Sequence, residues 1–231
     1  MTRTALFARE QLRAPFTLML LVTVPALFVI SAAGALSDFA DALGGSLAGD
    51  AAIALSAGWA AAFVSGTLGF FQAVASHQAD RRLALAGLGP ARVAASRILA
   101  SLLLAAVAAA AAFAALAIRV DMPHPWHAAV AISAFALLYL GIGVLIGSVV
   151  RAPLEGSLLV AFVFLLDAFA GPGMTDAPPP WAISQEAADA LIAAGLGLES
   201  PARDWLSLAA VTATALAAAL AVFALAARRR E

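Results

Sequence analysis

Six long apolar stretches alternate with short polar segments along the chain. They cover residues 15–35, 51–75, 98–118, 128–150, 154–170 and 205–227. An α-helix needs about 20 residues to cross a hydrocarbon core of ~30 Å, and only the fifth stretch is clearly shorter than this. The pattern predicts an all-α membrane protein in which residues 1–231 form a single transmembrane domain with six spans.

The basic residues are distributed unevenly between the two sides of these spans. Most of them precede the first span, follow the sixth, or lie in the second-to-third and fourth-to-fifth links: Arg3, Arg9, Arg13, Arg81, Arg82, Arg92, Arg97, Arg151, Arg228, Arg229 and Arg230. Arg119 and Arg203 lie on the opposite side, where most acidic residues gather. Because positive loops stay in the cytoplasm, both termini are expected to be cytoplasmic, in a multi-pass inner (plasma) membrane protein.

Composition limits what the chain does by itself. It is 64% hydrophobic, with a mean hydropathy of +0.98, and the spans leave no room for a soluble catalytic domain. All basic residues are arginine, so the lysine of a P-loop nucleotide site is missing and the chain is not expected to be an ATPase. The absence of lysine and asparagine, with abundant alanine, indicates a GC-rich bacterial or archaeal genome.

Residues 2–14 precede the first span and predict a short amphipathic helix. Arg3, Arg9, Glu10 and Arg13 share one arc of such a helix, which favours a position on the cytoplasmic membrane surface. The alternative is an ordinary positive flank that sets the topology.

The link between the second and third spans predicts a short helix across a cytoplasmic turn. Asp80 is suited to cap it, Gly87 or Gly89 to end it, and Pro90 to begin the helix that enters the third span. Between these signals lie two arginines beside Leu83 and Leu85. The alternative is a solvated positive loop.

The links on the opposite side differ from one another. The first, with Gly44, Gly45 and Gly49, is expected to be flexible. The long segment after the fifth span contains an external helix capped by Ser184, with an apolar face at helical spacing formed by Ala188, Leu191, Ile192, Gly195 and Leu196. The Gly-Pro-Gly sequence that starts this segment leaves open whether the fifth span bends or re-enters the membrane. In the fourth span, Gly141, Gly143 and Gly147 permit close helix packing.

Two polar residues within spans are candidates for a cargo path. Asp167 lies about 20 Å along the fifth span, and an ionisable group at membrane depth is a candidate for binding a substrate cation or a proton. The alternative is a structural carboxylate at the outer headgroups, satisfied by water or by Arg119. Gln72, in the inner part of the second span, either binds substrate or hydrogen-bonds a neighbouring helix.

The other chemistry-bearing residues point to no catalytic or metal site. His77 is placed inside, while His124 and His127 are placed outside, and no carboxylate accompanies them at metal-ligand spacing. None of the histidines lies at membrane depth, as an intramembrane serine protease would require. No catalytic residue, no metal and no cofactor is therefore expected in this chain.

The order of these parts resembles the ABC-2 permease family, the membrane subunits of type-2 ABC transporters. An N-terminal amphipathic helix, six spans, a charged helix between spans two and three and an external helix between spans five and six match over nearly the whole chain. The local signature is the run from Asp80 to Arg92, which is similar to the family's charged, leucine-rich loop followed by a small-residue/proline turn and a basic residue.

The resemblance implies a function and partners. The residues matching the coupling helix, which docks on the ATPase in that family, are Asp80, Arg81, Arg82, Leu83, Leu85 and Arg92. It implies a separate ABC ATPase that carries ATP and Mg, and a second copy or a related permease half, with the lipid bilayer as surroundings and no nucleic acid. The chain is then the permease of an exporter, and the few charges in its spans favour a hydrophobic or amphiphilic cargo. A membrane scaffold or lipid-handling protein without an ATPase is the alternative; an adjacent gene for an ATPase would favour the permease.

Overall fold

The computed structural model describes residues 15–85, 90–150, 152–175, 179, 181–198 and 202–228, and this part of the chain is helical. The helices are α2 (Pro15–Ala42), α3 (Gly49–Leu85), α4 (Pro90–Arg119), α5 (Pro125–Val149), α6 (Pro153–Ala170), α7 (Gln185–Gly195) and α8 (Ala202–Arg228). Six of them, all except α7, are long and apolar enough to cross a membrane, so the six predicted spans are confirmed. The expected helix at residues 2–14 lies outside the described residues.

Proline begins several of these helices. Pro125 and Pro153 stand in the first turns of α5 and α6, where the missing N–H costs no hydrogen bond. Glu155 lies in the first turn of α6, where a negative charge interacts favourably with the helix dipole. The short fifth span is one uninterrupted helix of 18 residues, so the bend or re-entry left open by the Gly-Pro-Gly sequence does not occur within it. Pro25 also lies inside a continuous helix, α2.

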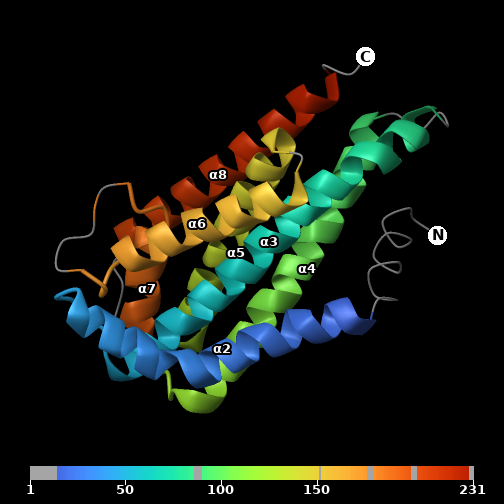
Figure 1. Ribbon diagram of the computed structural model, residues 1–231. Coiled ribbons are helices and arrows are strands. Elements are labelled where there is room, and N and C mark those ends of the chain that lie inside the picture. Colours follow the sequence, from blue (N-terminus) through green and yellow to red (C-terminus); the bar gives the residue numbers. More distant parts are fainter. Residues whose placement is uncertain are drawn as a thin grey trace.

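The bundle is built around α3 and α5. The membrane-spanning part of α3 is the most buried of the six, while α2, α6 and α8 bury few of their residues. In Figure 1, α3, α4, α5 and α8 run along a common direction, and α2 crosses them at a large angle. The end of α3, the start of α4 and the end of α8 lie at one end of the bundle, called the hairpin end below, and α7 lies at the opposite end, called the α7 end.

Glycines bring α3 and α5 into direct backbone contact. A Cβ atom at Gly143 would overlap the carbonyl oxygen of Gly66, and one at Gly147 would lie 2.7 Å from the carbonyl oxygen of Phe70. Gly141 faces α8 instead, with 3.2 Å from its would-be Cβ to the carbonyl oxygen of Ala215. The predicted role of these span-four glycines in close packing is confirmed, because a Cβ at Gly143 or Gly147 would collide with α3 and one at Gly141 would be crowded against α8.

The first link at the α7 end, expected to be flexible, is hydrogen-bonded to the segment after α6. The backbone N–H groups of Ser46 and Leu47 both donate to the carbonyl oxygen of Gly173, at 3.0 and 3.1 Å, and Leu47 is 2% exposed. Gly173 has a φ of +79°, a conformation that favours glycine. The α2–α3 link and the segment after α6 are therefore held together by backbone hydrogen bonds at the α7 end.

The predicted external helix is present as α7, but it is built into the bundle. Ala187, Ala188, Leu191 and Ala194 are buried, and a Cβ at Gly58 of α3 would lie 2.7 Å from Leu191. Leu196, assigned to the apolar face from its spacing, is 54% exposed, because the helix ends before it and buries alanines instead.

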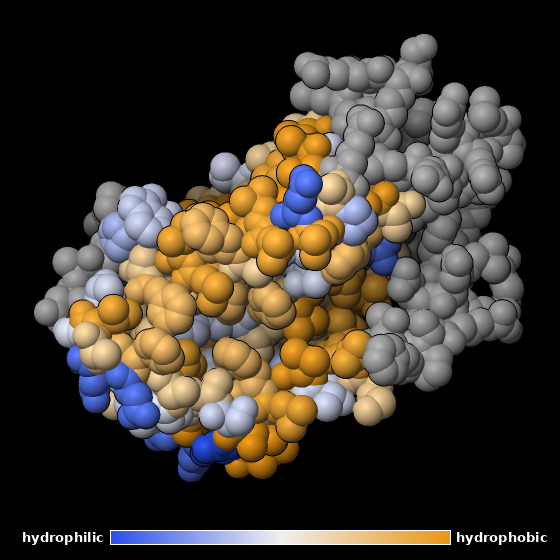
Figure 2. Space-filling view, in the orientation of Figure 1, coloured by the Kyte–Doolittle hydropathy of each residue, from blue (hydrophilic) through white to orange (hydrophobic). Residues whose placement is uncertain are grey.

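The exposed surface of the membrane-spanning helices is apolar. Large hydrophobic side chains are exposed along α6, namely Leu154, Leu158, Leu159, Phe162, Leu165, Leu166 and Phe169, and others are exposed along α2. Figure 2 shows this face as a broad hydrophobic area with hydrophilic residues towards the α7 end. An apolar exterior on this scale matches contact with lipid, in a multi-pass membrane protein.

Candidate functional site

Asp167 forms a buried polar junction between three helices near the α7 end. It lies in the last turn of α6 and is 3% exposed. Its Oδ2 accepts a 2.6 Å hydrogen bond from the hydroxyl of Tyr139 on α5, and its Oδ1 accepts from the backbone N–H groups of Ile183 at 2.6 Å and Ser184 at 3.2 Å. Both carboxylate oxygens therefore have protein donors.

This carboxylate occupies the position of a helix cap. Ile183 and Ser184 immediately precede α7, where backbone N–H groups have no partner within the helix and the helix dipole favours negative charge. The side chain of Ser184 was predicted to cap α7; it occupies the N-cap position but makes no capping hydrogen bond, so that prediction is wrong. Asp167 binds the N–H groups from another helix and so ties α7 to α6.

Arg119 does not contact this carboxylate, although the sequence left it as a candidate partner. Its guanidinium Nη1 donates to the backbone carbonyl of Ile30 at 2.6 Å and to that of Val29 at 3.4 Å. Arg119 thus joins the end of α4 to the middle of α2. The partners of Asp167 are a tyrosine and two backbone N–H groups, which are neither a substrate nor the water or Arg119 of the structural alternative.

Gln72 lies at another depth of the bundle. It is partly exposed on α3, two residues after Phe70, whose ring packs against Gly156 of α6. Gly156 precedes Asp167 by eleven residues, which is about 16 Å along the helix. The two candidate residues of the cargo path are therefore not brought together.

The candidate coupling residues lie on the ends of α3 and α4, beyond the apolar spans. The sequence of α3 is apolar up to Ala75, and the helix extends ten residues further, to Leu85, or about 15 Å. Asp80, Arg81, Arg82, Leu83 and Leu85 belong to this extension, and Arg92 belongs to α4 before the apolar stretch that starts at Ile98 in the sequence. The expected separate helix capped by Asp80 is wrong, because α3 passes through Asp80 without interruption. Gly87 and Gly89 lie outside the described residues.

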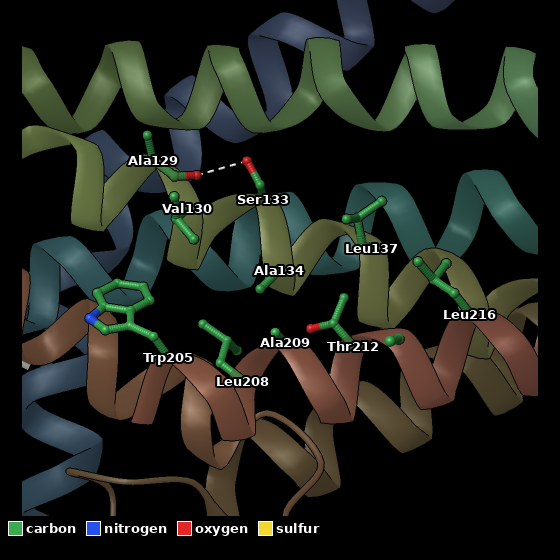
Figure 3. Close-up of a pocket in the computed structure, with 11 residues that line it drawn as sticks. Ala129, Val130, Ser133, Ala134, Leu137, Trp205, Leu208, Ala209, Thr212 and Leu216 are labelled. Atoms are coloured by element: carbon green, nitrogen blue, oxygen red, sulfur yellow. Dashed lines mark hydrogen bonds between the residues drawn. The ribbon is translucent and has the colours of Figure 1, made fainter. Parts of the chain in front are cut away.

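An open groove of about 470 Å³ runs between α5 and α8 (Figure 3). The wall on α5 consists of Ala129, Val130, Ser133, Ala134 and Leu137. The wall on α8 consists of Trp205, Leu208, Ala209, Thr212, Ala213 and Leu216. The lining is apolar apart from two hydroxyl groups. That of Ser133 donates to the carbonyl of Ala129 at 2.7 Å, whereas that of Thr212 is buried and has no hydrogen-bond partner.

Aromatic rings cluster where this groove meets the α7 end. The His127 ring stacks on Trp205 with a centroid distance of 5.0 Å and an interplanar angle of 26°, and Trp126 stacks on Trp205 at 5.7 Å. Tryptophan is typical of the boundary between lipid and water, so this cluster fits one edge of the membrane.

The described residues contain no group of three or more metal-ligating side chains. The two histidines of this region, His124 and His127, pack against each other, and His127 also packs against Trp126. Comparison of the chain with protein-family models, curated proteins and solved structures gives no match.

Sequence reasoning missed Tyr139 and Thr212. Tyr139 is the only tyrosine in the chain and lies within an apolar span, a signal that pointed to a buried hydroxyl with a partner. Thr212 has no comparable signal, since threonine in a membrane helix usually bonds its own backbone, as Thr214 does to the carbonyl of Ala210.

Proposed function

We propose that this protein is the membrane subunit of a two-component, ATP-driven exporter of the ABC-2 type, working with a separate ATPase. The observation that carries the proposal is the extension of α3 and α4 beyond their apolar spans, with arginines on both helices. A chain that only needed to reverse direction between two spans would have no use for helices about 12–15 Å longer than the membrane requires.

The extended pair suits the docking of a soluble partner. Arginine is enriched at interfaces and pairs well with carboxylates, while the leucines at 83 and 85 supply apolar contact. A continuous helix also transmits movement: α3 joins the candidate docking residues to the centre of the bundle, where it contacts α5 through Gly66. Displacement of the hairpin end by an ATPase would therefore shift the packing of α3 against α5.

The orientation and assembly of the exporter are also part of the proposal. The hairpin end faces the cytoplasm, together with both termini, and the α7 end faces outward. Two copies, or this chain and a related half, form the complete permease across the exposed apolar surface of the bundle. The cargo is hydrophobic or amphiphilic, because the charged residue at membrane depth, Asp167, is occupied by protein donors.

The test is co-purification with the ATPase encoded nearest to this chain. Charge reversal at a desolvated interface pair costs from about 2 to 5 kcal/mol, enough to release a partner. The double variant Arg81→Glu with Leu83→Asp is expected to insert and assemble normally but to lose the ATPase and cargo-stimulated ATP turnover. The control is Arg228→Glu with Arg229→Asp, which changes two arginines that follow the sixth span in the sequence, and this variant should retain the ATPase.

Retention of the ATPase and of turnover by the hairpin variant would make this segment a connecting loop. If no ATPase co-purifies with the unmodified chain either, the alternative of a scaffold or lipid-handling protein is favoured.

A further inference from the structure

We propose that the groove between α5 and α8 binds the chain of a single-chain amphiphile that enters from the bilayer, with a carbonyl group of the ligand accepting a hydrogen bond from Thr212. This inference rests on the proposed function in one respect: it names the class of cargo that the exporter would take up. The binding itself requires only this chain.

The length of the groove matches one leaflet. Its wall on α8 extends from Trp205 to Leu216, which is about 16 Å along the helix. The hydrocarbon core is ~30 Å thick, so the groove covers roughly half of it. The aromatic cluster of Trp126, His127 and Trp205 lies at the outer end, at the level where ligand headgroups meet indole rings.

The volume of the groove suits a slender ligand. The groove holds about 470 Å³, within the range of small-molecule sites. Alanines at positions 129, 134, 209 and 213 form much of its lining, and their small side chains leave this space open.

Thr212 gives the groove a specific polar contact. Four other helical hydroxyls, those of Ser31, Ser133, Ser148 and Thr214, donate to the carbonyl four residues earlier. The hydroxyl of Ser65 on α3 is also unpaired, but Ser65 does not line the groove. Thr212 is 8% exposed, and its hydroxyl has no partner. Figure 3 shows its side chain rising from α8 towards α5. Rotation about χ1 to another staggered position, of which threonine uses two in helices, is enough to turn the hydroxyl to a ligand.

An unpaired buried hydroxyl is costly, and a ligand acceptor removes that cost. Thr212 lies seven residues from Trp205, or about 10 Å deeper. A ligand whose headgroup rests at the aromatic cluster therefore places its first linking group, an ester or amide carbonyl, near this hydroxyl. Apolar walls with one or two fixed polar groups are the usual composition of sites that orient such ligands.

The experiment uses two photoreactive probes in vesicles that contain the purified full chain and no ATPase. Both probes have the same zwitterionic headgroup, chain length and diazirine on the chain, but one has an ester carbonyl below the headgroup and the other has methylenes there. Crosslinked residues are mapped by mass spectrometry over a range of probe concentrations. We expect both probes to label residues 129–137 and 205–216, and the ester probe to do so at roughly 2- to 10-fold lower concentration.

Three variants separate the contributions. Ala209→Phe fills the groove and should abolish this labelling, whereas the matched control Ala210→Phe, at the neighbouring exposed alanine outside the lining, should leave it intact. Thr212→Val keeps the shape and should keep the labelling but lose the preference for the ester. The ligand proposal is overturned if labelling follows lipid exposure across all spans, or if the two phenylalanine variants behave alike. It is also overturned if Ala213→Cys, in this cysteine-free chain, gives disulfide dimers in high yield without added oxidant.

Because these measurements use no ATPase, they are independent of the exporter proposal. Groove labelling without an ATPase partner would support a lipid-binding protein of another kind. An ATPase partner without groove labelling would leave the exporter with a different cargo path.

Discussion

Tyr139 donates a 2.6 Å hydrogen bond to Oδ2 of Asp167, and this contact joins the centre of α5 to the last turn of α6. The same carboxylate accepts the backbone N–H groups that begin α7. One side chain thus holds three helices in a region with little access to water. Buried polar groups of this kind are stabilising only while all of them are paired.

Replacement of this carboxylate is expected to loosen α7. Asp167→Ala leaves the Tyr139 hydroxyl and two backbone N–H groups without an acceptor, at about 1–3 kcal/mol each, so the loss of stability should exceed roughly 3 kcal/mol. Tyr139→Phe removes one donor only and should cost about 1 kcal/mol. Thermal unfolding in detergent measures both.

Asp167→Asn distinguishes anchoring from cargo binding. The amide oxygen can accept the N–H groups of Ile183 and Ser184, and the amide nitrogen can donate to Tyr139, so most of the stability should remain. An anchoring role predicts that turnover follows the amount of folded protein. Full stability with selective loss of cargo-stimulated turnover would instead assign the charge to the cargo.

The contact between α3 and α5 should not tolerate a side chain at position 143. A Cβ there overlaps the Gly66 carbonyl, so Gly143→Ala should separate the helices and cost about 1–3 kcal/mol, with a lower melting temperature and less folded protein. Gly34→Ala is the matched control, since a Cβ at this position in α2 meets nothing within 4 Å and alanine favours the helix. Equal melting temperatures for the two variants would contradict the glycine contact.

Cysteine labelling tests the orientation, because the chain has no native cysteine. Leu198→Cys, at a residue 57% exposed after α7, should react with an impermeant maleimide on intact cells. Ala84→Cys on the extension of α3 should react only after the membrane is opened. Ala187→Cys, on α7 but 0% exposed, should react only after unfolding. It is the control for a cysteine on the same side of the membrane as Leu198 that the reagent cannot reach. The reverse pattern for Leu198 and Ala84 would invert the topology.

Acidification should stabilise the α7 end through Asp189. Desolvation of its carboxyl, followed by repulsion from Glu186 and Asp204, raises its pKa above the ordinary value. A raised pKa in the folded state means that the ionised form destabilises the fold. The resulting stability is complete below the ordinary pKa of about 3.9 and is lost as the pH rises through the folded value.

Asp189→Asn removes this charge at all pH values. It should raise the melting temperature at pH 7 and reduce the gain of stability between pH 7 and pH 4. Melting curves over that range check the prediction, which fails if the variant and the unmodified chain show the same pH dependence.

The sequence by itself determined the number of spans, their approximate bounds and the existence of α7. These features depend on local properties: runs of apolar residues long enough for the bilayer, prolines at helix starts, and a helical period between Ser184 and Gly195. The packing role of the glycines in the fourth span could also be predicted, since small residues in a membrane helix have few roles besides close packing. The extent of α3 could not be predicted from the sequence. Aspartate is a common N-cap residue, so Asp80 suggested the start of a new helix, whereas the structure places it inside α3.

The tertiary structure decided which faces meet. The spans are apolar on all sides, so nothing along the chain distinguishes the buried α3 from the exposed α6. The role of Asp167 depended on Tyr139, 28 residues away, and on the arrival of α7 from the following segment. The unpaired hydroxyl of Thr212 and the groove around it exist only because α5 and α8 are neighbours. A partner on another helix leaves no signal in local composition, because it is selected by packing across the bundle.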